Sequence, residues 1–187
     1  MRLINNIEKS VISESLLEIS SQILPFLEKF SYKFYISLNK LEEENIYPMI
    51  YLISDNQSDI LNNMILIDNI ISAGLYFGFL KKGKLLLSLE GTEFLHEHEM
   101  IPKSKQMIVN NKGEKSILYG NHISKKMILN IPTDLKKNDF IAVFNQNNEI
   151  ISISRARIDF SSFKKMEPNN IAASNLLDKG YYLRRKQ

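Results

Sequence analysis

The sequence has no cysteine among its 187 residues. This absence excludes disulfide bonds, thiolate zinc sites and cysteine nucleophiles together, and it is typical of proteins in a reducing cellular interior. Long apolar runs are missing too, since no window reaches the roughly 18 to 20 uninterrupted apolar residues of a membrane-spanning helix. The first residues, Met1–Asn6, lead into a segment interrupted by polar residues and not into the apolar core of a signal peptide. We therefore expect an intracellular protein that does not bind membranes.

The patterns of common catalytic and cofactor-binding sites are also absent. Gly74 and Gly78 do not follow the strand–turn–helix order of a nucleotide fingerprint, and no lysine-containing phosphate loop is present. The chain has no Ser-His-Asp ordering and no His-Glu-x-x-His motif. His96 and His98 lie two residues apart, so on a helix they would point about 200° away from each other and would not bind one metal ion together. We expect no catalytic residue, no cofactor and no metal.

Basic residues are outnumbered in the first half of the chain, and acidic residues are outnumbered in the second half. Residues 1–99 contain 8 Lys and Arg against 14 Asp and Glu, whereas residues 100–187 contain 16 against 7. The formal net charge of +3 therefore conceals an acidic first part and a strongly basic second part. A polyanion would be attracted to the second part only. The change of sign, close to Pro102, predicts two domains, residues 1–99 and residues 100–187.

The apolar pattern of the first part predicts an α/β domain with a mostly antiparallel sheet and flanking helices. Pro25 should bend or end the first helix near its last turn, and Gly74 should end the second helix. Pro48 indicates an edge strand or a bulge, because proline cannot donate a hydrogen bond to a sheet. A charged turn is expected at Leu41–Asn45. The helices are expected at Ile4–Leu27, Ser58–Ala73 and Glu90–Met100, and the strands at Tyr32–Leu38, Ile46–Ile53, Leu75–Leu80 and Lys84–Leu89.

The second part consists of short apolar segments separated by Asn, Gly, Lys and Pro. Such spacing is typical of a small β-barrel-like domain. Gln146–Asn148 is expected to form a hairpin turn, because Asn tolerates positive φ. Lys112–Tyr119 is the single helix expected there. The whole chain is thus predicted to be an α+β protein, with strands of the second part at Met107–Val109, Met127–Leu129, Phe140–Phe144, Ile150–Ile153 and Ile171–Ala173.

Three groups of residues resemble the Nip-seven family of large-subunit ribosome-biogenesis factors, in its archaeal form. The clearest is Ser116–His122, where the family has an aromatic-Leu-Tyr-Gly-Asn-His run and this chain has Ser-Ile-Leu-Tyr-Gly-Asn-His. The other two are Gly74–Gly78, followed by Lys82, Lys84–Leu87 and Phe94-Leu95, and Lys179–Arg184 close to the end. The first 70 residues agree with the family only in length and pattern.

This resemblance implies an α/β domain that serves protein partners or positions the second domain, followed by an RNA-binding PUA domain. It implies non-enzymatic work on pre-ribosomal RNA and large-subunit assembly, with a preference for U- or AU-rich RNA. The implied partners are the Shwachman–Bodian–Diamond type of ribosome-maturation protein, the exosome and pre-ribosomal particles. The implied location is the cytoplasm of an archaeon, or the nucleus and nucleolus of a eukaryote.

The chain departs from the family at two places. Lys125-Lys126-Met127 stands where the family has small glycines, and Ser152-Ile153-Ser154 stands where it has Gly-x-Gly. In PUA domains such glycines let the RNA backbone come close. The departures concern the detail of RNA binding and leave the predicted fold unchanged.

The candidate RNA contacts are the cations of the second part. Lys and Arg neutralise phosphates and release counterions, and Arg also stacks on bases. The alternative for each of them is an ordinary solvated surface. They are Lys125, Lys126, Arg155, Arg157, Lys164 and Lys165, with Arg184, Arg185 and Lys186 at the end of the chain.

Asn121 and His122 are further candidates for contacts with a base or a phosphate, although such residues more often satisfy backbone groups at a turn. Gly120 is expected to allow positive φ after the helix. Strict alternation would place Arg155 and Arg157 on one face with Ile151 and Ile153. That arrangement requires either a bulge or a strand that continues beyond the edge of the core.

Two other functions fit a chain with a PUA domain. One is a translation-initiation-type factor of similar length, which would bind the small ribosomal subunit. The other is an RNA-modifying enzyme with an appended PUA domain. The enzyme would need a cofactor loop or a catalytic carboxylate in a pocket, and the acidic first part shows neither pattern.

Overall fold

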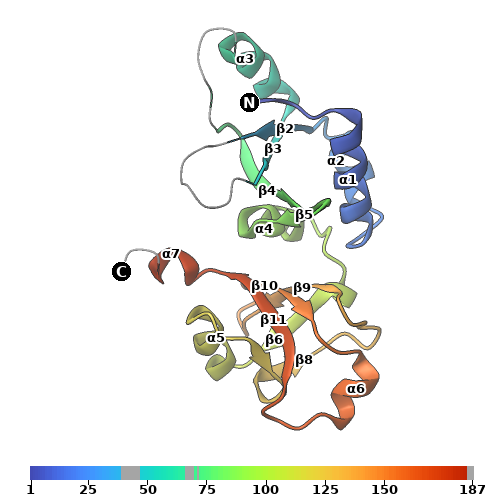
Figure 1. Ribbon diagram of the computed structural model, residues 1–187, viewed down its shortest axis with the longest axis vertical. Helices are drawn as coiled ribbons and strands as arrows, with labels where there is room; N and C mark the ends of the chain where they lie inside the picture. Colours follow the sequence, from blue (N-terminus) through green and yellow to red (C-terminus); the bar gives the residue numbers. More distant parts are fainter. Residues whose placement is uncertain (39–46, 66–69, 71, 185–187) are drawn as a thin grey trace. The chain divides into compact units, whose positions relative to one another are not determined.

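The computed structural model describes residues 1–38, 47–65, 70 and 72–184. The chain forms two compact units, Met1–Met100 and Ile101–Gln187, and each has its own sheet and helices (Figure 1). The first sheet is antiparallel and the second is a near-barrel, which confirms the predicted α+β class. No helix in the described ranges is both long and apolar enough to cross a bilayer.

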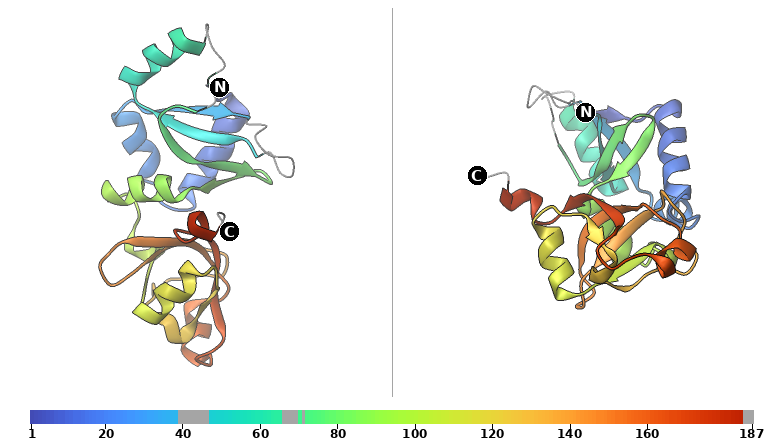
Figure 2. Two further views of the ribbon diagram at one scale, coloured as in Figure 1. Left: turned by 90° about the vertical axis from the view of Figure 1, so that its left-hand side faces the viewer. Right: turned by 60° about the horizontal axis from the view of Figure 1, so that its bottom comes forward.

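The first unit is built on an antiparallel sheet in the order β1-β2-β3-β4-β5. Helix α1 packs beside β5, where the amide of Leu85 donates to Ser15 Oγ at 2.9 Å, and α4 packs beside β4 (Figure 2). Tyr35, Ile53 and Leu61 form a buried cluster. The strands are β1 (Arg2–Leu3), β2 (Lys33–Ser37), β3 (Met49–Ile53), β4 (Leu75–Lys81) and β5 (Lys84–Leu87), and the helices are α1 (Asn6–Leu17), α2 (Ile23–Lys29), α3 (Asp55–Ile65) and α4 (Leu89–Glu97).

The predicted helix Ile4–Leu27 is in fact two helices, α1 and α2. Pro25 lies in the first turn of α2 and does not end a helix. Proline is tolerated in a first turn because the amides there have no partner within the helix. The chain therefore interrupts the helix at residues 18–22 and begins a new one two residues before Pro25.

Two other expectations for the first unit were wrong in part. Pro48 does not mark an edge strand, because β3 is the central strand of the sheet and Pro48 precedes it, accepting a hydrogen bond from the amide of Leu80 at 2.9 Å. The other alternative, a bulge, has a counterpart close by, since the register of β3 against β4 shifts between Ile50 and Tyr51. The helix predicted at Ser58–Ala73, which is α3 in the structure, does not continue to Ala73, since Ser72 and Ala73 are not helical. Gly74 therefore does not end a helix and leads directly into β4. The predicted charged turn Leu41–Asn45 lies outside the described residues.

The second unit contains a six-stranded sheet in the order β7-β11-β10-β9-β6-β8. Its neighbouring strands are antiparallel except for the parallel pair β6 and β9. The core is made by apolar side chains of the strands and of α5, among them Met107, Ile117, Ile141 and Val143. Its elements are η1 (Lys103–Lys105), β6 (Gln106–Val109), α5 (Asn111–Leu118), β7 (Ile123–Ser124), η2 (Lys125–Met127), β8 (Ile128–Asn130), β9 (Phe140–Phe144), β10 (Ile150–Ala156), α6 (Phe160–Lys165), β11 (Ile171–Asp178) and α7 (Tyr181–Arg184).

The predicted hairpin at Gln146–Asn148 is confirmed, and Asn148 has φ of 61°. The expectation of a single helix was wrong, because α6 and α7 are helical as well as α5. Both are too short to give a helical repeat of apolar residues. Phe160 and Phe163, three residues apart on α6, pack against the core. This pair is the one apolar spacing in the sequence that indicates α6.

Candidate nucleic-acid interface

A bulge in β10 decides which way its arginines point. Ile150 pairs with Phe144 of β9, but Ser152 pairs with the next residue, Val143, so Ile151 is an extra residue on β10. An extra residue reverses the alternation of side chains beyond it. Ser152, Ser154 and Ala156 therefore share the core side of the sheet. Arg155 and Arg157 lie on the opposite side, with Ile153 and without Ile151.

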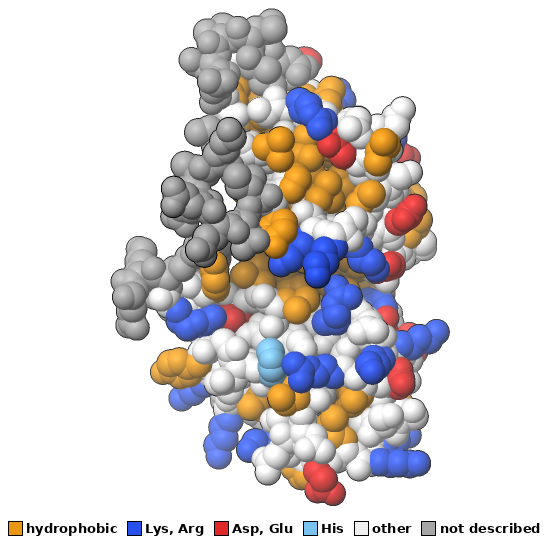
Figure 3. Space-filling view, in the orientation of Figure 1, with side chains coloured by type: hydrophobic (Ala, Val, Ile, Leu, Met, Phe, Trp, Pro, Cys, Tyr) orange, Lys and Arg blue, Asp and Glu red, His pale blue; other side chains and the backbone are white. Residues whose placement is uncertain are grey.

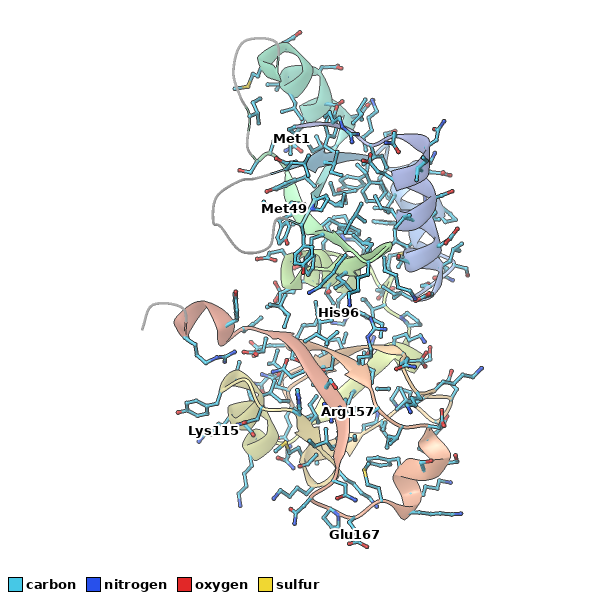
Figure 4. All side chains as sticks on the ribbon, viewed as in Figure 1. Met1, Met49, His96, Lys115, Arg157 and Glu167 are labelled. Atoms are coloured by element: carbon cyan, nitrogen blue, oxygen red, sulfur yellow. The ribbon has the colours of Figure 1, made fainter. Side chains whose placement is uncertain are left out.

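Arg155 and Arg157 are held beside β11 on this outer side. Arg157 is exposed, and its Nε donates to Ser174 Oγ of β11 at 2.6 Å. Arg155 is half-buried, and its Nη1 lies 3.4 Å from the carbonyl oxygen of Asn138, a long hydrogen bond. Figure 4 shows Arg157 over β11.

The loop before β7 reaches the same side of the sheet. Ile123 pairs with Ala173 of β11, so the preceding residue, His122, lies next to Ser174. Asn121 and His122 are both exposed. Figure 3 shows Lys and Arg side chains spread over the visible surface of the second unit. We call the outer side of β10 and β11, with Arg155, Arg157 and Ser174 and with the adjoining Asn121 and His122, the basic face.

Lys136 and Lys137 border the basic face and were not among the predicted contacts. Their loop lies along the end of β10, because the amide of Asn138 donates to the carbonyl of Ala156 at 2.9 Å. Both lysine side chains are exposed. The signal in the sequence was a pair of lysines just before the turn that leads into β9, whereas Ser174 gave no signal at all.

The other predicted lysines gather around the end of α6. Lys125 Nζ donates to the carbonyl oxygens of Lys164 at 3.2 Å and Met166 at 2.6 Å, and it lies 5.5 Å from the ring centre of Phe163. These carbonyls belong to the C-terminal end of α6, where a cation is favoured. Lys125 therefore caps a helix.

The remaining three lysines of this group are exposed. Lys126 Nζ donates to Asn169 Oδ1 at 2.8 Å, and Lys164 Nζ lies 4.9 Å from the ring centre of Phe160. Within the described part of the chain, Lys165 has no hydrogen bond or ion pair. This group could add phosphate contacts close to Arg157, because the Arg157 amide donates to the carbonyl of Ala172 and the Lys125 amide to that of Asn170, two residues away on the same segment.

The two serines that replace the family's Gly-x-Gly point into the unit. Ser152 and Ser154 are fully buried, and their hydroxyls lie 3.0 Å apart. The Ser152 hydroxyl also donates to Asn175 Oδ1 at 3.1 Å. Their side chains therefore do not stand on the basic face and do not obstruct a ligand there.

Arg184 was predicted as a further RNA contact, but its guanidinium is engaged within the unit. It makes two hydrogen bonds of 3.0 Å to the two carboxylate oxygens of Asp178, and it donates to the carbonyl of Leu118 at the end of α5. The hydrogen bond with Asp178 raises the pKa of Arg184. Arg185 and Lys186 lie outside the described residues.

The described residues hold no group of three or more His, Asp or Glu side chains that could bind a metal ion. His98 stacks on Phe94, with ring centres 4.6 Å apart, and its Nδ1 lies 2.8 Å from the carbonyl oxygen of Phe94. An aromatic contact and a backbone contact thus account for this histidine.

The second unit matches a known family of domains. Residues 105–187 match the UPF0113 PUA domain, and PUA domains are a known class of RNA-binding domain. A UPF0113 protein of Archaeoglobus fulgidus is 27% identical over 100 residues, which are 54% of this chain and 55% of that protein. The chain therefore matches little more than half the length of this relative.

Solved archaeal structures share the fold over nearly the whole chain. A hypothetical protein of Pyrococcus horikoshii OT3 has a TM-score of 0.65 at 11% identity, covering 95% of this chain and 93% of that one. A conserved PUA domain protein of Thermoplasma acidophilum has a TM-score of 0.60 at 16% identity, covering 99% and 97%. Identities this low show the fold alone. Residues 105–187 thus match the UPF0113 PUA domain, within a chain whose fold recurs in solved structures that include a PUA domain protein.

Proposed function

We propose that this protein is a non-enzymatic RNA-binding adaptor that holds RNA on the basic face of its PUA domain. The observation that best supports this proposal is that Arg155 and Arg157 lie on one side of β10. Each guanidinium has five N–H donors, and a single hydrogen bond is formed by each in the structure. Neither arginine is paired with a carboxylate among the residues that the structure describes. Both therefore keep donors for phosphates and bases.

The RNA that we propose is single-stranded and rich in U or in A and U, as the resemblance to the Nip-seven family implies. Arg side chains can contact phosphates and stack on bases, and exposed Asn121 and His122 can donate to base edges. The same resemblance supports a role in pre-ribosomal RNA processing and large-subunit assembly. The Shwachman–Bodian–Diamond type of protein, the exosome and pre-ribosomal particles are the proposed partners.

The first unit is the proposed docking site for these proteins. Residues 1–99 have an excess of six acidic over basic residues, which disfavours contact with RNA phosphates. An adaptor of this kind would bind RNA with one unit and protein with the other.

The first test is RNA binding by the double variant Arg155→Ala, Arg157→Ala. Each lost phosphate contact on single-stranded RNA lowers the slope of log K against log salt by about 0.7, so the slope should fall by about one to two. Affinity for a uridine-rich oligonucleotide would be measured by fluorescence anisotropy at several salt concentrations. Lys112→Ala with Lys115→Ala removes the same charge from exposed positions of α5 and serves as the control. Equal affinity and equal slope in the arginine variant and the wild type would contradict the proposed face.

The second test separates the ribosomal role from its alternative. A large-subunit factor should sediment with large-subunit precursors when lysate is fractionated on a sucrose gradient. Sedimentation with small-subunit particles alone would instead support a translation-initiation-type factor.

A further inference from the structure

The C-terminal end of α5 is closed by side chains from the last part of the chain. The final carbonyls of a helix have no partner within it, so they need donors from elsewhere. The carbonyl of Ile117 accepts from Asn175 Nδ2 at 3.2 Å, and that of Leu118 accepts from Arg184 Nη1. Strand β11 and helix α7 thus supply the donors for two successive carbonyls of α5.

Both donors converge on one buried carboxylate. Asp178 is 3% exposed, and it accepts from Asn175 Nδ2 at 2.9 Å as well as from both Nη atoms of Arg184 at 3.0 Å. A bidentate pair of this kind fixes the orientation of the guanidinium as well as its position. The charge of Arg184 is compensated by Asp178, so this cation has little left to offer a phosphate.

Two glycines let the chain pass close to this arginine. Gly120 has φ of 88°, and a Cβ there would lie 3.2 Å from Arg184 Nη2. Gly180 lies against the carbonyl of Leu118, and a Cβ at that position would collide with it. The backbone of Gly120 therefore lies close to the guanidinium of Arg184, with a positive φ that other residues rarely adopt.

The next two residues after Gly120 are Asn121 and His122, which carry the α5 side of the basic face. The amide of Asn121 still donates to the carbonyl of Ser116 at 3.2 Å, so the loop begins from the closed end of α5. The loop thus starts at the helix end that Asn175 and Arg184 cap.

We infer that Arg184 is a positioning residue for RNA binding, which acts through Gly120 to orient Asn121 and His122 and does not itself contact RNA. This inference rests on the proposed function and adds a residue that lies outside the basic face. Arg184, which the sequence suggests as a phosphate contact, is thus inferred to support the loop of Asn121 and His122.

The test compares Arg184→Met with Lys112→Met in the full chain. Both variants lose one positive charge, but Lys112 is an exposed residue of the first turn of α5, remote from its end. Arg184→Met should weaken binding of a uridine-rich oligonucleotide about fivefold, which is about 1 kcal/mol and lies within the range of about 0.5–3 kcal/mol by which members of one hydrogen-bond network couple. The salt slope should stay at the wild-type value, because no phosphate contact is lost. Lys112→Met should bind like the wild type.

A second variant reaches the same loop without changing any charge. Gly120→Ala places a methyl group against Arg184 at a backbone φ that alanine rarely adopts, so it should weaken binding with the slope unchanged. Circular dichroism melts would fix a temperature at which every variant is folded, and binding would be measured there. The pair Asn121→Ala, His122→Ala completes a mutant cycle with Arg184→Met. If Arg184 acts through the loop, Arg184→Met should change affinity less than twofold once both loop side chains are gone, because no loop contact with RNA is left for it to orient.

Each outcome decides one question. Unchanged affinity of Arg184→Met in the folded protein would overturn the inference and leave Arg184 with a role in stability alone. A salt slope lower by about 0.7 would show a direct phosphate contact and would overturn it as well. Equal losses of affinity from Arg184→Met in the wild-type background and in the Asn121→Ala, His122→Ala background would do the same. Failure of the wild type to bind RNA would instead overturn the proposed function, and the role of Arg184 with it.

Discussion

At the scale of single residues, cations of the same chemical type do different work in the second unit. Arg157 is exposed and is held only by Ser174 at 2.6 Å. Arg184 caps α5 and pairs with Asp178, and Lys125 caps α6 through two carbonyls. What separates them is the kind and number of internal acceptors. A carboxylate and helix-end carbonyls occupy Arg184 and Lys125, which therefore contribute to stability, whereas Arg157 donates to one hydroxyl and keeps its other N–H donors for a ligand.

Lys125→Met should therefore reduce stability more than RNA affinity. Loss of a charged donor from the end of α6 should lower the free energy of unfolding by about 1 kcal/mol. Urea denaturation followed by circular dichroism would measure this. Lys165→Met is the matched control, because Lys165 is an exposed residue of α6. It should change the free energy of unfolding by no more than about 0.5 kcal/mol. Equal stability of the two variants would refute the capping role of Lys125.

The sequence could not distinguish these roles, because the acceptors are distant along the chain. The acceptors of Lys125 lie 39 and 41 residues away, and the carbonyl that Arg184 caps lies 66 residues away. By contrast, the role of Gly120 was predictable, since a glycine directly after a helix commonly adopts positive φ, and it has φ of 88°. Local chemistry is visible in a sequence, whereas the partner of a long side chain is set by the fold.

At the scale of elements, helix α1 illustrates how a local motif fixes one end of a segment. Asn5 and Glu8 form a reciprocal capping box, in which each side chain accepts from the backbone amide of the other, at 2.9 and 2.8 Å. Arg2 pairs with Glu8 at 2.6 Å, which ties β1 to the start of α1. The hydrogen bond from Arg2 lowers the pKa of Glu8, with a further contribution from the amide of Asn5.

A lowered pKa means that Glu8 stabilises the fold when it is ionised. This contribution should be complete above the ordinary glutamate pKa of about 4.3 and should be lost as the pH falls through the lower value in the folded protein. Glu8→Gln should therefore cost about 0.5 kcal/mol near neutral pH, and this cost should shrink in acid. Glu14→Gln, at an exposed position on the same helix, should show no such trend in urea denaturation at several pH values. A cost for Glu8→Gln that is independent of pH would contradict the ion pair.

The elements that sequence patterns predicted well are those with an alternating or helical apolar pattern, such as β2, β4 and α5. The errors occurred where tertiary structure overrides the pattern. Continuous apolar spacing concealed the break between α1 and α2. The bulge at Ile151, by contrast, is one of the two alternatives that the sequence left open, because a core face cannot continue into Arg155 and Arg157 without one of the two. The sequence could not choose between a bulge and a strand that continues beyond the core, since the choice depends on the pairing with β9.

At the scale of the whole molecule, charge divides the chain at the boundary between its units. The first part has 14 acidic against 8 basic residues, and the second has 16 basic against 7 acidic residues. RNA should therefore be drawn to the PUA domain by long-range attraction, and this attraction should weaken as salt rises. The acidic unit remains for protein partners in this proposal.

The most direct measurement of the central claim is a map of the residues that touch RNA in the full-length protein. A uridine-rich oligonucleotide that contains 4-thiouridine would be crosslinked by light, digested and analysed by mass spectrometry. Crosslinks should fall on peptides that contain residues 121–122, 155–157 and 172–176, and they should disappear with Arg155→Ala, Arg157→Ala. Crosslinks confined to residues 1–100, or an unchanged pattern in that variant, would contradict the account.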